Sequence, residues 1–449
     1  MGQADRPRKR VGHVCMLVKN SFQYDARVTR EATSLVTAGW DVTVIAVHVP
    51  GAPRRETTAA GVQVVRVPRI YGRLSGFAGP STIAPGAAST PARWFQLSPA
   101  VLRTDRQNDC AVDHELSSGL RRSLRSMVRV VAAFPRALNN LVLDHRFAAQ
   151  ARALRPSVIH AHDLNTLTAA RRVKRSEDAW LVYDAHELQA HRNGMGTARR
   201  AWTRIAERRG MRDVDVMITA TDAWADYLAG FYKVDRPHVV RNVPERAPPT
   251  RRRSLREALM IGEGQRVLVY QGSIQPNRGL EQTIAALHHL PECVLVVIGY
   301  GEHRAELQRL AQRVGLSARV RFVGPVPNDE LLSYTAGADV GMCCIINSSL
   351  SYYWSLPNKV FEYMMAGIPS VTSDFPEMGR FVKEEGIGEV CNPSDVRDIS
   401  RAVARIIHDP SHEQRLRAAA RAAAERHHWG REERRLHEVY AQIPRRVAA

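Results

Sequence analysis

The carboxylate Glu362 lies in the segment 354–369, where a polar loop leads into a short helix. We expect this helix to begin near Asn358 and to end before Gly367. The free N–H groups and the positive dipole at the start of such a helix suit an anion such as a diphosphate. Glu362, about one turn in, could accept hydrogen bonds from both hydroxyls of a ribose. It could equally do no more than complement the helix start.

A glycine-rich loop at 272–279 follows an apolar run and precedes another predicted helix. Its glycines would let the backbone approach a phosphate closely, and Arg278 could neutralise that phosphate. The loop alone is a weak signal. It gains weight from the helix at Asn358, because both features suit the same anion.

Two histidines, His162 and His186, follow apolar runs that read as neighbouring strands. The carboxyl ends of parallel strands point into the ligand crevice of an α/β sheet, so both side chains could contact a substrate. A lone histidine at a strand end is often only hydrogen-bonded structure. Two of them at neighbouring strand ends favour a functional role.

Strand and helix patterns alternate through both halves of the chain. The expected strands cover 11–18, 40–49, 62–67, 157–161, 180–185, 214–220, 238–242, 266–271, 293–298 and 320–324, and the expected helices include 26–38, 280–290 and 304–314. This succession predicts an α/β protein of two doubly wound parallel-sheet domains that face a cleft. We place the first domain at 1–243, with a mobile insertion at 70–118, and the second at 244–425, with a separate terminal helix at 426–449.

The net charge of +19 is uneven, because +16 of it lies in residues 1–242. Such a field attracts phosphates, anionic membrane or nucleic acid, although high arginine use can also reflect genomic composition. Residues 120–141 form a basic amphipathic pattern that either packs on its own sheet or lies on a membrane. Basic residues are not interleaved with stacking aromatics, so we expect no nucleic-acid partner.

Membrane spans, signal peptides and metal clusters are not indicated. No apolar run approaches the roughly 18 residues that a spanning helix needs. The six cysteines show no Cys-x-x-Cys spacing, which is typical of buried thiols in a reducing cytoplasm. We therefore expect a cytoplasmic protein that could also bind peripherally to the inner face of the cell membrane.

Taken together, the motifs resemble those of glycosyltransferase family 4, retaining enzymes of the GT-B fold. The matching stretches are 272–279, 299–301, 320–324 with Glu330-Leu331, 361–369, 25–32, Gly39 with Val42 and Val44, and 160–163, so the resemblance covers most of the chain except 70–118. It implies that the terminal helix crosses back to the first domain. It also implies a nucleotide-sugar donor, UDP-linked more readily than GDP-linked, and a hydroxyl acceptor that is lipid-linked or small. The implied products are cell-envelope glycans, glycolipids or secondary-metabolite glycosides, made with retained configuration.

The resemblance assigns roles to particular residues. Catalytic roles fall to His162, Arg278 and Glu362, and donor contacts to Gly272, Ser273, Arg278, Gly299, Gly301, Val323, Gly324, Val326, Asn358, Lys359, Val360 and Glu362. Acceptor or first-loop contacts fall to Asn20, Asp25, Arg27 and His186. No cofactor or metal is expected. Asp213-Val214-Asp215 resembles the metal-binding Asp-x-Asp of other sugar transferases, and we interpret it as a helix end and strand start.

Three departures from the family pattern stand out. Ser273 and Arg278 replace the usual Arg and Lys pair, Trp354 replaces the first Glu of Glu-x7-Glu, and the first loop lacks its double glycine. Because Trp354 replaces the Glu that would contact the donor sugar, the pattern does not identify that sugar. A nucleotide-sugar epimerase of the same fold, or a basic nucleic-acid-binding protein, are the alternatives.

Overall fold

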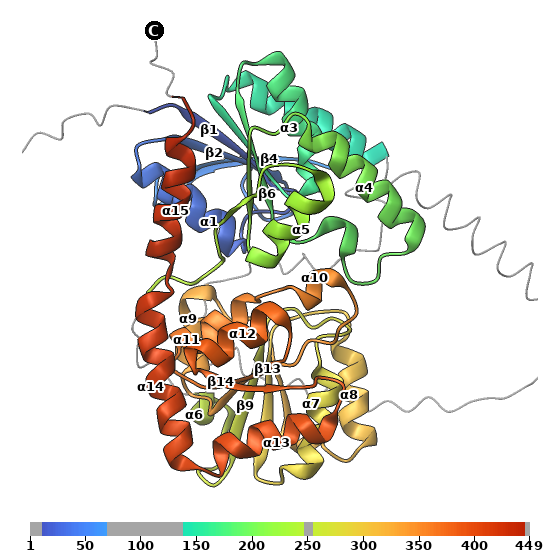
Figure 1. Cartoon of the computed structure of the whole chain (residues 1–449), viewed down its shortest axis with the longest axis vertical. Coiled ribbons are helices and arrows are strands. Elements are labelled where there is room, and N and C mark those ends of the chain that lie inside the picture. The colour runs from blue at the N-terminus through green and yellow to red at the C-terminus, as the bar shows by residue number, and fades with distance from the viewer. Residues whose placement is uncertain (1–10, 70–137, 247–254, 445–449) are drawn as a thin grey trace, which may run out of the picture.

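A computed structural model describes residues 11–69, 138–246 and 255–444, and shows two α/β domains, one above the other in Figure 1. The first contains an eight-stranded sheet in the order β3-β4-β2-β1-β5-β6-β7-β8. Its strands are β1 (His13–Leu17), β2 (Asp41–Val47), β3 (Arg55–Thr57), β4 (Gln63–Val67), β5 (Val158–His162), β6 (Trp180–Ala185), β7 (Val216–Thr219) and β8 (His238–Val239). All neighbours are parallel except β3, which pairs antiparallel with β4.

Helices cover both faces of this sheet. They are α1 (Ala26–Thr37), a helix described over 138–153, α3 (Leu164–Ser176), α4 (Thr197–Met211) and α5 (Asp222–Tyr232), with a 3-10 turn η2 at Gln189–His191. β2 is buried almost throughout because a parallel strand between two helical layers has no face in water. α1 begins where the Asp25 side chain accepts from the Val28 N–H, and it buries Val28, Ala32 and Leu35.

The second domain repeats the plan with a six-stranded sheet in the order β11-β10-β9-β12-β13-β14. The strands are β9 (Arg266–Gln271), β10 (Cys293–Ile298), β11 (Val320–Val323), β12 (Val340–Cys343), β13 (Ser370–Ser373) and β14 (Gly388–Cys391). The helices are α6 (Leu255–Leu259), α7 (Leu280–Ala286), α8 (Arg304–Arg313), α9 (Asn328–Thr335), α10 (Leu350–Tyr353), α11 (Asn358–Met365), α12 (Pro376–Glu385) and α13 (Val396–Ile407), with 3-10 turns η3 (Leu287–His289) and η4 (Ser317–Arg319).

Two final helices connect the domains along one side of the molecule. α14 (Pro410–Arg426) lies on the second domain, and α15 (Trp429–Ala441) lies against α1 of the first (Figure 1). The indole of Trp429 donates to the Ser34 hydroxyl at 2.9 Å, and the rings of Trp40 and Tyr440 meet edge to face at 5.7 Å. The predicted fold class is therefore confirmed, including the crossing helix.

The predicted elements agree with the structure closely, with some differences. β3 was not predicted because its three residues are polar and partly exposed at the edge of the sheet. Most of the predicted helix at 120–141, and all of the insertion at 70–118, lie outside the described residues. None of the described helices has the length and apolar character needed to span a bilayer.

Candidate active site

The glycine-rich loop after β9 stacks on the loop after β10. Gly272 has a φ of +117°, and it and Ser273 are exposed. A Cβ on Gly299 would lie 2.0 Å from the Gly272 carbonyl oxygen, and one on Gly301 would lie 1.9 Å from that of Ile274. Packing therefore accounts for Gly299 and Gly301, which we had expected to contact the donor. Their close approach supports the exposed part of the loop at Gly272 and Ser273.

Glu362 is held by a chain of hydrogen bonds that starts on α9. The Thr335 hydroxyl donates to Gln271 Oε1 at 2.6 Å, and the Gln271 amide donates to Glu362 Oε2. Burial raises the pKa of Glu362, while Gln271, Lys359 and Arg30 oppose that rise. Arg30 belongs to α1, so a positive charge of the first domain acts on Glu362 in the second domain. Neither Gln271 nor Arg30 was expected from the sequence, because their partner is distant along the chain.

Two cations near the glycine loop rest on aromatic rings. The Arg278 guanidinium lies 4.7 Å from the centre of the Tyr352 ring, and Lys359 Nζ lies 3.6 Å from that of Tyr270. A Cβ on Gly272 would lie 3.8 Å from Lys359 Nζ. In the described part of the chain, neither cation forms an ion pair with a carboxylate. Lys359 thus supplies, from α11, a second positive charge where the family pair has become Ser273 and Arg278.

The start of α11 agrees with the prediction at Asn358, but Val360 does not. Its side chain is fully buried, and its N–H already bonds to the Pro357 carbonyl oxygen at 3.0 Å, so neither is free for the expected donor contact. Asn358 is exposed. After β11, Val323 is buried, Gly324 and Val326 are partly exposed, and Val326 packs on the core of the domain.

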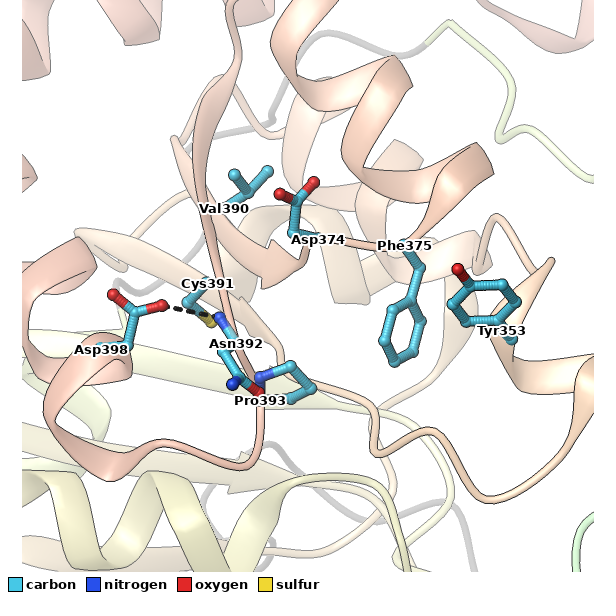
Figure 2. A pocket seen from close by; sticks show the side chains of 8 residues that line it. All are labelled: Tyr353, Asp374, Phe375, Val390, Cys391, Asn392, Pro393 and Asp398. Carbon is cyan, nitrogen blue, oxygen red and sulfur yellow. Dashed lines mark hydrogen bonds between the residues drawn. The ribbon is translucent and has the colours of Figure 1, made fainter.

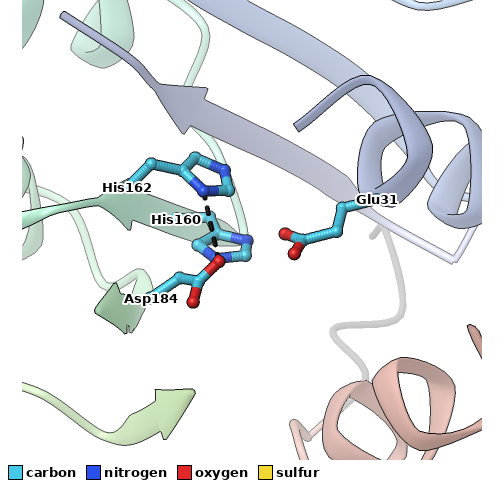
Figure 3. A group of neighbouring side chains, drawn as sticks. All are labelled: Glu31, His160, His162 and Asp184. Atoms are coloured by element: carbon cyan, nitrogen blue, oxygen red, sulfur yellow. Dashed lines mark ion pairs between the residues drawn. The ribbon is translucent and has the colours of Figure 1, made fainter. Parts of the chain in front are cut away.

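The first domain contributes a buried charged cluster at the carboxyl ends of β5 and β6. Arg27 binds Asp184 with two hydrogen bonds, Nε to Oδ2 at 2.8 Å and Nη2 to Oδ1 at 2.9 Å. The same guanidinium pairs with Glu31 at 2.9 Å and donates to the Val240 carbonyl oxygen at 2.7 Å. Figure 3 shows Glu31 and Asp184 on either side of His160 and His162.

These contacts correct the expectation for the first loop. Arg27 is only 3% exposed and each of its three nitrogens donates inside the cluster, so its burial leaves no surface for an acceptor. Asp25 caps α1 and accepts from the Asn20 amide at 2.7 Å. Asn20 remains exposed, and its amide oxygen accepts from the Phe22 N–H at 2.8 Å.

His162 and His186 are brought together as the strand ends predicted. His186 Nε2 lies 3.1 Å from His162 Nδ1 and 3.0 Å from Asp184 Oδ2. Burial would lower the pKa of His186, but Asp184 and Asp163 outweigh it and raise the pKa to about 10. His186 is therefore a cation at neutral pH. Its shared Nε2–H points to both acceptors.

The two ring nitrogens of His162 have different surroundings. Its Nδ1 lies 3.1 Å from His186 Nε2 and 3.5 Å from Asp184 Oδ2, and burial lowers the pKa of the ring. Its Nε2 is buried and lacks a hydrogen-bond partner among the described residues. A buried polar atom left without a hydrogen-bond partner costs about 1–3 kcal/mol of stability. A ligand that bonds to Nε2 would remove this cost.

The cluster has its own internal balance of charge. Burial alone would raise the pKa of Asp184, but Arg27 and the two histidines hold that pKa well below its usual range. Burial raises the pKa of Glu31 to about 8 against the attraction of Arg27. His160 stacks on His162 at 4.2 Å, and its Nδ1 lies 2.9 Å from the Tyr440 hydroxyl of α15. The returning helix thus fixes the ring that supports His162.

Four side chains of this cluster have the spacing of a metal site. Donor atoms of Glu31, His160, His162 and Asp184 lie within 4.8 Å of one another. Arg27 binds both Asp184 oxygens and pairs with one oxygen of Glu31, so a metal ion bound there would lie close to the positive guanidinium. The Asp213 and Asp215 pair is structural as interpreted, because Asp213 binds Arg171 and Asp215 binds Lys174.

The two domains touch at the rim of the shared cleft. Asn193, after β6, accepts from the Asn277 amide at 3.1 Å, which joins the first domain to the glycine loop. The Trp354 ring lies 5.5 Å from that of Tyr227 and packs on the first domain's core. The residue that replaces the family's Glu therefore contributes an interdomain contact.

A separate surface pocket of about 330 Å³ lies in the second domain and shares no residue with the predicted donor set. It is lined by Tyr353, Asp374, Phe375, Val390, Cys391, Asn392, Pro393 and Asp398 (Figure 2). Asp398 accepts there from the Asn392 N–H at 2.7 Å.

Known proteins resemble this chain in sequence and fold. Residues 251–423 match the family described as Glycosyl transferases group 1, and residues 99–244 match the Glycosyl transferase 4-like domain. A glycogen synthase from Mycobacterium tuberculosis is 28% identical over 280 residues, which are 60% of this chain and 64% of the relative, less than two thirds of its length.

Two solved structures share the fold over nearly their whole length. One is a sucrose-phosphate synthase from Thermosynechococcus elongatus, with a TM-score of 0.71, 17% identity, and coverage of 96% of this chain and 98% of the other. The second is Anabaena HepE in complex with UDP-glucose, with a TM-score of 0.65, 14% identity, and coverage of 96% and 99%. The chain therefore belongs to the GT-B glycosyltransferases of the family 4 type, a family of transferase enzymes.

Proposed function

We propose that the protein transfers a sugar from a nucleoside-diphosphate donor to a hydroxyl acceptor with retention of anomeric configuration. The observation that carries the proposal is the position of Glu362 beside Lys359 and Arg278 around an exposed glycine loop. A carboxylate suits the ribose hydroxyls, and the two cations suit the diphosphate. The UDP-glucose complex of HepE supports a UDP-linked donor, and a GDP-linked donor is the alternative.

Departure of the diphosphate is the step at which charge develops, so fixed positive groups near its oxygens would lower the barrier most. Arg278 and Lys359 supply two of them, and Ser273 can add a hydrogen bond. No metal is required for this role. The acceptor hydroxyl attacks from the face that the diphosphate leaves, and closure of the domains excludes water.

The first domain would bind the donor sugar through His162. Its Nε2 is one of the buried polar atoms that lack a partner among the described residues, and its Nδ1 faces His186 and Asp184. Trp354 cannot accept a hydrogen bond from a sugar hydroxyl as the family's Glu would. The identity of the donor sugar must therefore be measured directly. For the acceptor, we propose a lipid-linked glycan intermediate or a small metabolite.

The test is a panel of UDP- and GDP-sugars scored for slow hydrolysis, with the first-formed anomer read by NMR. We expect one donor to be cleaved and the retained anomer to be released first. First release of the opposite anomer would reject retention. Conversion of the donor sugar into its epimer, with no acceptor present, would favour the epimerase alternative.

Glu362→Gln tests the ribose contact with little change in shape. We expect binding of the nucleotide to weaken about tenfold to a hundredfold, because a hydrogen bond to a charged group is worth about 1.5–3 kcal/mol. Isothermal titration with UDP and GDP measures this. Glu263→Gln, an exposed carboxylate before β9, is the matched control. Equal affinity in Glu362→Gln and the control would remove the ribose role.

A further inference from the structure

Helix α4 exposes large apolar side chains on a basic face. Trp202 is 69% exposed and Ile205 is 45% exposed, three positions apart on one side of the helix. In Figure 1, α4 lies on the side of the first domain away from α15. Exposed Trp and Ile on neighbouring turns need an explanation, because each leaves apolar area in water.

The inner side of α4 fixes which residues point outward. Buried Glu207 accepts hydrogen bonds from the Tyr183 hydroxyl at 2.9 Å and the Tyr232 hydroxyl at 2.6 Å. Gly210 packs so tightly that a Cβ would lie 2.4 Å from a methyl carbon of Leu167. With that side anchored, the 3.6-residue period directs Trp202 and Ile205 to the opposite side.

The charge on the outer side is positive without compensation from α4 itself. Four exposed arginines lie on α4 or directly after it, namely Arg199, Arg208, Arg209 and Arg212, and Arg208 donates to the Phe231 carbonyl oxygen at 3.3 Å. The carboxylate of α4, Glu207, is buried and bonded to two tyrosines, so it cannot neutralise them. The outer face therefore combines an indole, an aliphatic side chain and several guanidinium groups.

We propose that this outer face of α4 docks on an anionic lipid surface. The indole and Ile205 would enter the headgroup boundary, while the arginines extend along it to lipid phosphates. This partner is favoured over cover by the chain itself, because residues 70–137 hold nine Arg against four Asp or Glu. A second copy would present the same basic face. Like charge disfavours both contacts.

Vesicle sedimentation of the full chain, without any donor or acceptor, tests the proposal. We expect binding to phosphatidylcholine vesicles that contain phosphatidylglycerol, little binding to phosphatidylcholine alone, and loss of binding at high salt. Trp202→Ala combined with Ile205→Ala should weaken binding at least about tenfold, because it removes most of the apolar anchor. Arg199→Gln combined with Arg209→Gln should weaken it and flatten the salt dependence.

Met260→Ala is the matched control, since Met260 is 88% exposed but lies in the second domain. It should bind vesicles as the unchanged protein does. Equal vesicle binding by the Trp202 and Ile205 double variant and this control would overturn the proposal. The proposal would also be overturned if light scattering showed a dimer of the unchanged protein that the double variant does not form. Protection of Trp202 from acrylamide quenching in the absence of lipid would overturn it as well. Because the assay uses no nucleotide sugar, failure of the proposed transferase chemistry would leave its result unchanged.

Discussion

The two sides of the cleft manage charge in opposite ways. In the first domain, Arg27 and His186 both pair with the buried carboxylate of Asp184. In the second, Arg278 and Lys359 lie on aromatic rings without an ion-paired carboxylate among the described residues. The paired cluster can hold a side chain such as His162 in one state. Arg278 and Lys359 remain available for an anionic ligand, because a cation–π contact stabilises each of them only modestly.

Removing one member of the paired cluster should have the largest effect on stability. Asp184→Ala leaves the guanidinium of Arg27 buried without its bidentate partner, and we expect a loss of about 3–5 kcal/mol in the free energy of unfolding. Denaturant unfolding measures this. Asp213→Ala is the control, because its pairs with Arg171 and Arg175 lie near the surface and should contribute about 1 kcal/mol or less. Similar losses in both variants would show that the cluster is not a buried ion-pair network.

The cations on rings should give the reverse result, a loss of rate with little loss of stability. Arg278→Ala and Lys359→Ala each remove a positive charge from the expected diphosphate, and we expect the transfer rate to fall about a hundredfold to a thousandfold. Initial rates with the cleaved donor measure it, with unfolding curves on the same samples. Lys383→Ala is the control, since Lys383 pairs with Asp374 at the surface. A rate change below about threefold in both variants would place the diphosphate elsewhere.

Sequence patterns were sufficient to predict two parallel-sheet domains but not the pairing of charges. Apolar runs bounded by glycines predicted β9, β10 and the start of α11, because those elements depend on local residues. The burial of Arg27 could not be predicted, since its partner Asp184 is 157 positions away and an arginine in a first loop equally suits a ligand. Asp184 itself could have been found. It lies two positions before His186, on the same face of an extended strand.

The same limit applies to the second side of the cleft. Lys359 was expected from the motif at Asn358, but its place beside Gly272 depends on a fold that brings residues 272 and 359 together. Gly299 and Gly301 were assigned to the donor through the family resemblance. The close approach of the adjacent loop's backbone also requires glycine at both positions, and periodicity cannot reveal that packing.

The dependence of stability on pH offers the finest test of the paired cluster. Because the pKa of His186 is raised from 6.5 to about 10, its contribution is complete below pH 6.5 and is lost as pH rises through about 10. Glu31, raised to about 8, acts in the same direction but is largely titrated above that pH. Between pH 8 and 10, the unchanged protein should therefore lose up to about 1.4 kcal/mol per pH unit more than His186→Gln does. Denaturant unfolding at several pH values measures the difference, with His408→Gln, an exposed histidine paired to Glu292, as the control. Parallel curves for His186→Gln and the unchanged protein would mean that Asp184 and Asp163 do not hold His186 as a cation.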